Sequence, residues 1–404
     1  MRIALTANGP GEVAGWVRPL VRRLYERALD TEVYLFLVPD DYATGYEARM
    51  ARALFPSAHV YDPKTYVGVA LGRGAPDLPS KVDVVQYLGG DLTHVMRVHA
   101  RLGGIPTTYK FSKPRYSERF ARAFAVDAKN VEQLSGWKTP AGRIETVGNL
   151  AIDGALLEAQ APLEPGTPED GILIMPGSRR YEIDNLVPLF FTAAARLLRE
   201  RPEIPIAFGI SPFNSNQQLR EAVERGGHPR VWADKARVEE QGDRAWIVSL
   251  DGSVRIPIVR SALAAATRSR LVLTLPGTKC IELAALGVPM VSFTPFNAPE
   301  VVTVNGPLTY LDRIPVVGIP LKRAAATAVA NRFPYHTQPN MDAGAMVIRE
   351  VKSTVTAARI ARILLDSYDD RAWLAETSTQ LAGLYRDHVG AADRMAESLL
   401  ELAG

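Results

Sequence analysis

The chain has 404 residues, 47% of them apolar and 23% charged, a balance typical of a packed globular protein of two or three domains. Its net charge of +3 is too small to indicate nucleic-acid binding, and a single cysteine, Cys280, excludes an internal disulfide and a cysteine-only zinc site. No apolar run approaches the roughly 20 residues of a membrane-spanning helix, and the sequence starts with a strand-like run and glycines, unlike a signal peptide. We therefore expect a cytoplasmic protein, either free or peripheral to the inner face of the cell membrane.

Short apolar runs alternate with segments of helical period in the first part of the chain. Val17, Leu20, Val21 and Leu24 have the spacing of an amphipathic helix between two of these runs. Such alternation is typical of a parallel sheet with crossover helices. The predicted strands are residues 2–7, 33–38, 82–88 and 107–111.

A linker-like segment, EAQAPLEPGTPED at 158–170, then interrupts the pattern with three prolines and four acidic residues. The alternation starts again after it, and an apolar stripe from Ile183 to Leu197 predicts a long helix. After Thr354 we expect helix to the end of the chain. The predicted strands of this part are residues 172–175, 205–210, 245–250, 271–275 and 289–293.

These patterns predict an α/β protein with two doubly wound, Rossmann-like domains. We place the first at 1–160, the second at 161–375 and a helical segment at 376–404. The last helices either cross back to the first domain or exchange between the subunits of a homodimer. Open parallel sheets bind ligands beyond the carboxyl ends of their strands, so we expect the two domains to face a ligand cleft.

The loop after the first strand is the first of three that suit a phosphate. Gly9, Gly11 and Ala14 satisfy G-x-G-x-x-A, and Asp40 ends the second strand, where a ribose-binding acid belongs. One interpretation is therefore an NAD-dependent oxidoreductase with its cofactor in the first domain.

The second loop follows the first strand of the second domain and contains Gly177, Ser178 and Arg179. We expect Ser178 to be the N-cap of the following helix, because serine accepts from the free N–H groups there. Arg179 adds a cation with a planar donor fork that suits a pyrophosphate.

The third loop, also between a strand and a helix, contains Gly277 and Thr278. Both can donate to a phosphate, and Glu282, one turn into the helix, can accept from ribose hydroxyls. Two such loops in one domain favour a diphosphate nucleotide there.

Several segments, in collinear order, resemble the lipid-A-disaccharide synthase family. PGSRRYEI at 176–183 and GTKCIELAALGVPMV at 277–291 resemble two of its motifs. GEVAG at 11–15 resembles its G-E-x-S-G loop, and QPNMDAG at 338–344 its P-N-x-x-A-G segment. The stretch 82–110 resembles its strand–turn–helix–strand, with LGGD in the place of the family's D-A-P-D.

This resemblance implies a GT-B glycosyltransferase that is inverting, independent of metals and free of other cofactors. It would move a sugar of the N-acetylglucosamine type from a UDP-sugar to a lipid-linked or phosphorylated acceptor. Asp91 takes the place of the aspartate associated with catalysis, with Gly11 and Glu12 on the acceptor side. By the same correspondence, the donor-site residues are Gly177, Ser178, Arg179, Gly277, Thr278, Glu282 and Asn340.

The sequence departs from the family at several positions. The aspartate that follows G-E-x-S-G is Trp16 here, the first acid of D-A-P-D is Leu88, and the arginine after A-G is Ala345. The segment from Gly306 to Asn340 is longer. Most of the donor-side pattern is kept, so the acceptor is the least determined part.

Asp91 is the predicted general base for the acceptor hydroxyl, because it follows a hydrophobic strand and would face the ligand. The alternative role is N-cap of the following helix. His94, at i+3, either orients or replaces Asp91, or is a partly buried structural histidine. We expect no metal, since there is no D-x-D pair at a strand end and the six histidines lack ligand spacing.

A basic stretch runs from Arg97 to Arg122, with seven Lys or Arg residues against one acid, Glu118, and interleaved Tyr and Phe. This mixture predicts contact with a phosphorylated ligand or an anionic membrane surface; the alternative is a solvated helix face. Two further functions stay open within the same fold: a UDP-sugar 2-epimerase, and a catalytically silent protein that binds a nucleotide sugar.

Overall fold

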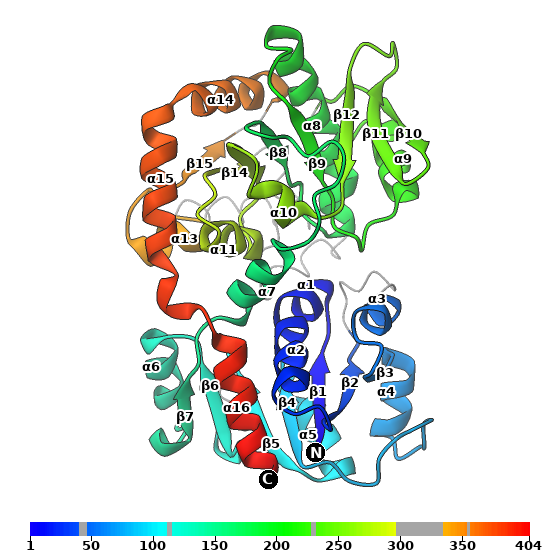
Figure 1. Ribbon diagram of the computed structural model, residues 1–404, viewed down its shortest axis with the longest axis vertical. Helices are drawn as coiled ribbons and strands as arrows, with labels where there is room; N and C mark the ends of the chain where they lie inside the picture. Colours follow the sequence, from blue (N-terminus) through cyan, green and yellow to red (C-terminus); the bar gives the residue numbers. More distant parts are fainter. Residues whose placement is uncertain (40–46, 111–114, 228–231, 296–333, 354–355) are drawn as a thin grey trace, which may run out of the picture. The chain divides into compact units, whose positions relative to one another are not determined.

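The computed structural model describes residues 1–39, 47–110, 115–227, 232–295, 334–353 and 356–404. The chain divides into two compact units, one formed by Met1–Leu157 with Arg386–Gly404 and the other by Glu158–Tyr385. Each unit contains one mainly parallel sheet covered by helices (Figure 1). The predicted fold class, two Rossmann-like α/β units, is confirmed.

The first unit has a seven-stranded parallel sheet in the order β3-β2-β1-β4-β5-β6-β7. Because β4 pairs with β1, the loops that follow these two strands emerge at the same edge of the sheet. The strands are β1 (Arg2–Ala7), β2 (Glu32–Leu37), β3 (His59–Tyr61), β4 (Val84–Tyr87), β5 (Ile105–Tyr109), β6 (Arg122–Ala125) and β7 (Ile144–Thr146).

Both faces of this sheet are buried, as expected for parallel strands between helices. Along β1, Ile3 and Leu5 join the core on one face and Ala4 the core on the other. The helices are α1 (Pro10–Glu12), the π-helical η1 (Val13–Val17), α2 (Arg18–Arg27), α3 (Glu47–Leu54), α4 (Pro63–Ala70), α5 (Leu92–Leu102), the 3-10 helix η2 (Ser117–Arg119), α6 (Ala128–Gly136), the 3-10 helix η3 (Ala141–Arg143), α7 (Leu150–Glu158), the 3-10 helix η6 (Arg386–His388) and α16 (Ala391–Ala403).

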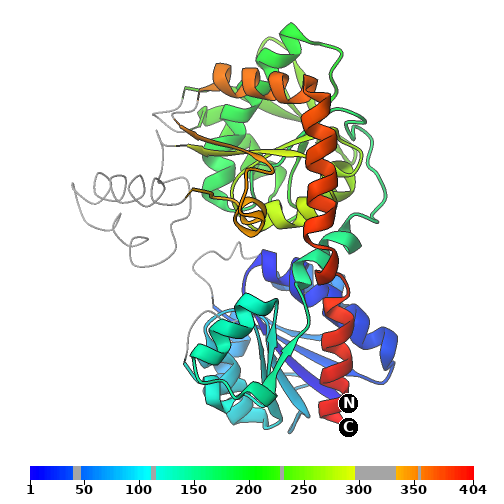
Figure 2. The same ribbon diagram turned by 90° about the vertical axis from the view of Figure 1, so that its left-hand side faces the viewer.

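The C-terminal helix α16 belongs to the first unit, as one of the two sequence alternatives predicted (Figures 1 and 2). Met395 and Leu399 are fully buried in the same core as α2. Arg27 of α2 donates to both oxygens of Asp393, at 2.9 and 2.8 Å. Asp153 accepts from the backbone N–H groups of Gly390 and Ala392, and so ties the start of α16 to α7.

The second unit has an eight-stranded sheet in the order β10-β11-β12-β9-β8-β13-β14-β15. The strand expected at 245–250 is not a parallel crossover strand: it lies in an antiparallel meander with β10 and β12. The two-residue loop Gly242–Asp243 explains this difference, since glycine with positive φ suits a hairpin turn. The strands are β8 (Ile172–Ile174), β9 (Ile206–Gly209), β10 (Ala236–Gln241), β11 (Arg244–Ser249), β12 (Arg255–Val259), β13 (Leu271–Thr274), β14 (Met290–Pro295) and β15 (Arg349–Ser353).

Helix α8 carries the longest apolar stripe of the second unit, and the predicted face from Ile183 to Leu197 is buried in its core. The expectation of helix after Thr354 is also confirmed over the described residues. The helices are α8 (Arg180–Glu200), α9 (Asn216–Arg225), α10 (Ala262–Ala266), α11 (Thr278–Ala285), α13 (Gln338–Ala343), α14 (Ala357–Asp369) and α15 (Arg371–Leu384).

Candidate functional site

In the first unit, the loops after β1 and β4 pack against each other. Gly89 leaves room for this contact, because a Cβ there would lie 2.5 Å from Asn8 Oδ1 and 3.1 Å from Glu12 Cγ. The structure therefore brings Glu12 and the loop that ends in Asp91 to one place. Gly11 is exposed in the same region.

Asp91 is the N-cap of α5, which was the alternative role. Its Oδ1 accepts from the backbone N–H of Thr93 at 2.9 Å and from the Thr93 hydroxyl at 2.5 Å. Burial, followed by the charges of Glu12 and Asp91, raises the pKa of Tyr87, whose hydroxyl donates to Gly90 O at 2.8 Å. The carboxylates of Glu12 and Asp91 therefore both raise the pKa of the same Tyr87 hydroxyl at this edge of the sheet.

His94 is half-buried and has a defined partner. Its Nδ1 lies 2.7 Å from the hydroxyl of Tyr66, and the two rings meet edge to face with centroids 5.3 Å apart. Burial lowers the pKa of His94, Asp91 raises it by a smaller amount, and Arg97 lowers it further. The imidazole is therefore held toward its neutral form, which can orient or exchange a proton.

Two departures from the family pattern in this unit are accounted for by packing. Leu88 is fully buried in the core that also holds α16. Trp16, in the π-helical η1, is packed edge to face on Tyr109 with centroids 5.5 Å apart. Tyr109 in turn accepts from the backbone N–H of Leu150 at 2.9 Å. Apolar side chains at these two positions contribute to the core, where the family's acids would be desolvated.

In the second unit, the N-terminus of α8 differs from its sequence prediction. The N-cap is Arg179, not Ser178. Glu182 folds back, and its Oε2 accepts from the backbone N–H groups of Ser178 at 2.9 Å and Arg179 at 3.0 Å. This capping arrangement uses the donors that the sequence assigned to a phosphate. Burial raises the pKa of Glu182, and its bonds to the Arg179 and Ser178 backbone partly offset this.

The N-terminus of α11 is organised differently. Gly277 is its N-cap, no side chain among the described residues caps it, and Gly277 and Thr278 are exposed. Glu282 is buried and pairs with Lys279 at 2.6 Å, so it is not the solvent-facing helical residue that is the ordinary alternative. Burial lowers the pKa of Lys279, but the charges of Glu282 and Glu158 and the hydrogen bond to Glu282 together outweigh it, so the pKa is raised. Burial also raises the pKa of Cys280 to about 12, in keeping with a packing role.

Asn340 is fully buried, and its amide is used internally. It donates to Ile348 O at 3.0 Å and to Glu350 Oε1 at 2.8 Å, and it accepts from Ile348 N at 2.9 Å. Glu350 also accepts from the backbone N–H groups of His336 and Thr337, and these hydrogen bonds lower its pKa against the effect of burial. Asn340 therefore holds α13 against β15.

Sequence reasoning missed Glu182 and Glu350, and also a polar network after β9. Asn214, 2% exposed, donates to Ser178 O at 2.9 Å. Arg260 donates to the carbonyl oxygens of Ser211 and Asn214, at 3.1 and 2.7 Å. No period or motif marks Asn214 or Arg260, because their partners lie far away in sequence.

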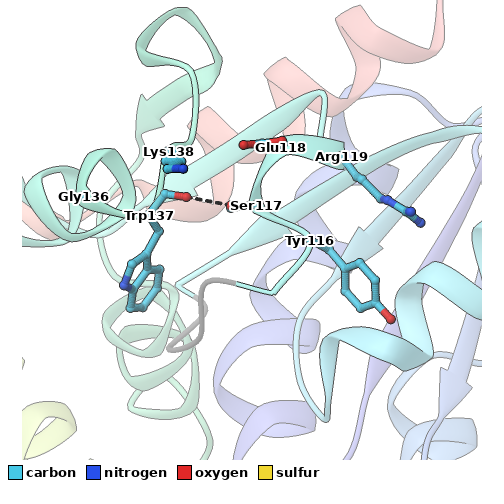
Figure 3. A pocket seen from close by; sticks show the side chains of 7 residues that line it. All are labelled: Tyr116, Ser117, Glu118, Arg119, Gly136, Trp137 and Lys138. Atoms are coloured by element: carbon cyan, nitrogen blue, oxygen red, sulfur yellow. Dashed lines mark hydrogen bonds between the residues drawn. The ribbon is translucent and has the colours of Figure 1, made fainter.

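A shallow pocket of about 450 Å³ lies between η2, which belongs to the basic stretch, and the end of α6, which does not (Figure 3). The side chains of Tyr116 and Trp137 lie on opposite sides of it, and the cations of Arg119 and Lys138 are nearby. The guanidinium groups of Arg115 and Arg119 lie 4.8 and 5.4 Å from the Tyr116 ring centroid. Amphipathic aromatic rings beside cations suit an anionic, partly apolar ligand.

Some predicted features lie outside the described residues: Asp40 of the NAD alternative, Lys113 of the basic stretch and Gly306. Within the described ranges, no group of three or more His, Cys, Asp or Glu side chains is arranged to hold a metal ion. No helix of the described part is long and apolar enough to cross a membrane.

The chain is similar to several lipid-A-disaccharide synthases. It is 33% identical to the enzyme of Ruegeria pomeroyi over 120 residues, which are 30% of this chain and 26% of that protein. It is 24% identical to the enzyme of Chromobacterium violaceum over 392 residues, 95% of this chain and 78% of that protein. The chain is a distant homologue of the lipid-A-disaccharide synthases. No protein-family model matches it, and it spans about a quarter of the Ruegeria enzyme's length.

Solved structures show the fold of this homologue independently. UDP-GlcNAc 2-epimerase from Neisseria meningitidis, bound to UDP-GlcNAc, matches with a TM-score of 0.53 over 99% of this chain and 100% of that one, at 14% identity. At that identity the likeness establishes the fold alone. The homologue thus has the GT-B arrangement of two Rossmann-like units.

Proposed function

We propose that this homologue is an inverting, metal-independent glycosyltransferase that uses a UDP-sugar, with a sugar of the N-acetylglucosamine type, and a lipid-linked or phosphorylated acceptor. The carrying observation is the N-terminus of α11: it follows a parallel strand, no side chain among the described residues caps it, and it lies within a motif that resembles the synthases. Collinear similarity to the Chromobacterium synthase over 95% of the chain supports the same assignment.

In this proposal, the second unit binds the donor. Backbone N–H groups at Gly277 and Thr278 hold the diphosphate, since a helix N-terminus favours anions. Arg179, on the neighbouring loop after β8, stabilises the leaving diphosphate, as an electrostatic partner in place of a metal. Glu282 accepts from the ribose, and Asn340 acts indirectly by holding α13.

The first unit supplies the chemistry on the acceptor. Asp91 is the proposed base, and a general base contributes about 100- to 10,000-fold to a rate. A carboxylate has two oxygens, so capping α5 through Oδ1 is compatible with accepting a proton from a hydroxyl. Gly11 and Glu12 line the acceptor side, and His94 orients Asp91 or the acceptor.

The acceptor class is inferred from the basic stretch and from the pocket that Tyr116 and Trp137 line beside it. We expect binding to vesicles that contain phosphatidylglycerol, weakening as salt rises, and little binding to phosphatidylcholine alone. Arg119→Glu with Lys138→Glu should abolish it. Failure to bind the anionic vesicles at any salt concentration would remove the membrane contact from the proposal.

The deciding experiment is calorimetric titration with UDP in EDTA, with NAD as the comparison ligand. We expect micromolar UDP binding, about −8 kcal/mol. Binding of NAD without UDP would instead place the site in the first loop and favour an oxidoreductase. If the protein binds neither UDP nor NAD, the result would favour a protein without catalytic function.

The nearest alternative is a UDP-sugar 2-epimerase, the activity named for the Neisseria enzyme that shares this fold. Product analysis with the donor sugar alone separates the two. An epimerase converts UDP-N-acetylglucosamine to its 2-epimer without an acceptor, whereas the proposed transferase leaves it unchanged.

A further inference from the structure

The two helix N-termini that the sequence assigned to a diphosphate are not equivalent. We propose that Glu182 is a built-in anion that closes the N-terminus of α8 to phosphate, so that the diphosphate is directed to α11. This inference rests on the proposed nucleotide-sugar function and makes Glu182 a specificity-determining residue of the donor site.

Hydrogen-bond geometry is the first support. One oxygen of Glu182 accepts from two consecutive backbone N–H groups, those of Ser178 and Arg179, at 2.9 and 3.0 Å. A phosphate oxygen that approached the loop at Ser178 and Arg179 would need these two donors. The Glu182 side chain is only 12% exposed, so its carboxylate occupies the position rather than extending into solvent.

Gly177 is the second support, because it has the space that this carboxylate needs. Its φ is +101°, and a Cβ on it would lie 2.1 Å from Glu182 Oε2 and 2.7 Å from Glu182 Cδ. Any side chain at position 177 would therefore displace the carboxylate. A glycine before a helix is usually explained as leaving room for a ligand. Gly177 instead leaves room for the side chain of Glu182, which folds back over it.

The loop is also held in place from its other side. Asn214, on the segment after β9, donates to Ser178 O, and Arg260 holds the carbonyl of Asn214. Glu164 accepts from the backbone N–H groups of Arg260 and Ser261 in turn. Ser178 is thus fixed through both its N–H and its C=O, and the closed loop is part of a connected network.

Helix α11 shows the contrasting state in the same unit. Gly277 and Thr278 are exposed, and a Cβ on Gly277 would meet nothing within 4 Å. The carboxylate one turn into α11, Glu282, is paired with Lys279. Both acids have a basic partner, Arg179 for Glu182 and Lys279 for Glu282, but among the described residues only Glu182 also accepts backbone N–H groups of its own helix terminus.

The test uses inorganic pyrophosphate and UDP as separate calorimetric probes on the full chain. Glu182→Ala removes the internal anion, and Gly177→Ala expels it without removing its charge. We expect each to raise pyrophosphate affinity at least about tenfold, because two backbone donors become available to an anion. The double variant should gain no more than either single one, since both remove the same contact.

Controls separate this effect from general disturbance. Gly242→Ala also places an alanine at positive φ (+59°), in the β10–β11 turn, where a Cβ meets no described atom within 4 Å, and should leave pyrophosphate affinity unchanged. Asp251→Asn alters another carboxylate that accepts a backbone N–H, at 3.0 Å from Ser253, and should also be silent. If Glu182→Ala unfolds, Gly177→Ala alone carries the test, because Gln at position 182 would keep an acceptor for the same N–H groups.

Loss of structure weakens ligand binding, so a rise in pyrophosphate affinity cannot result from partial unfolding of a variant. Unchanged or weaker pyrophosphate binding in folded Glu182 and Gly177 variants would overturn the inference, even if the wild type binds UDP. Absence of UDP binding by the wild type would instead defeat the proposed function, while the pyrophosphate comparison would still decide the role of Glu182.

Discussion

The two units share one fold type, yet the loops at the carboxyl ends of their strands carry opposite chemistry. In the first unit these loops present Glu12, Asp91 and the half-buried His94. In the second they present Arg179, the Lys279–Glu282 pair and the terminus of α11, which no described side chain caps. The first set suits proton transfer and the second suits an anion. The difference teaches that the fold places loops, whereas the few residues on them decide what each unit does.

The units also differ in how they are completed. The second is one continuous segment, Glu158–Tyr385, whereas the first needs Arg386–Gly404 from the far end of the chain. Helix α16 fills a place on the sheet beside α2. The stability of the first unit should therefore depend on a segment that lies far from its other residues in sequence.

The sharpest test of the chemical contrast is Asp91→Asn. Asparagine keeps a good N-cap but is no base, so we expect turnover of a UDP-sugar to fall about 100- to 10,000-fold with UDP affinity unchanged. Asp62→Asn is the matched control, because Asp62 caps α4 through Thr65 in the same way. Steady-state kinetics and calorimetry check both. Full activity in Asp91→Asn would remove the catalytic assignment.

A second prediction addresses the returning helix. Leu399→Ala should lower the free energy of unfolding by about 2–5 kcal/mol, since a fully buried leucine leaves a cavity. Leu29→Ala is the control, because Leu29 is 92% exposed in the same unit. Denaturant unfolding monitored by circular dichroism measures both. Equal, small losses would mean that α16 contributes little to the first unit.

The anion-binding character of the second unit is tested by Arg179→Ala against its neighbour Arg180→Ala. We expect the first to weaken UDP binding about 10- to 150-fold, the range for hydrogen bonds to charged groups. Arg180, 77% exposed at the side chain, should change it little. Calorimetric titration measures the UDP affinity of both variants. Equal losses of affinity would mean that Arg179 contributes only its positive charge and no specific contact.

The smallest expected effect is a pH dependence at His94. Burial lowers its pKa in the folded chain, so the unfolded chain binds a proton near pH 6.5 that the folded one does not. Stability should therefore fall as pH decreases from above 6.5 toward the folded pKa. Melting temperatures at pH 7.5 and 5.5 should drop less in His94→Asn than in the wild type. An equal drop in both would show that His94 titrates normally.

Strands β3, β6, β7, β10, β12 and β15 were not predicted from the sequence. Sequence patterns alone did predict two units of parallel strands and helices, the apolar face of α8 and the loops that carry the candidate site residues. Each of these depends on neighbours within a few residues, and so leaves a local period or motif. The predicted N-cap at Ser178 shows the limit: the N-cap is Arg179, whose side chain accepts no hydrogen bond, and Glu182 supplies the capping contact by accepting the Arg179 N–H.

Tertiary structure alone decided the features that depend on distant partners. The return of α16 to α2, the packing of Trp16 on Tyr109 and the inward turn of Asn340 toward Glu350 are of this kind. So is the difference between the two helix termini, since the closed state of α8 combines Glu182 and Gly177 with Asn214 from the next strand's loop. A local pattern shows which face of a segment is buried; which other segment covers it is decided only when the whole chain packs.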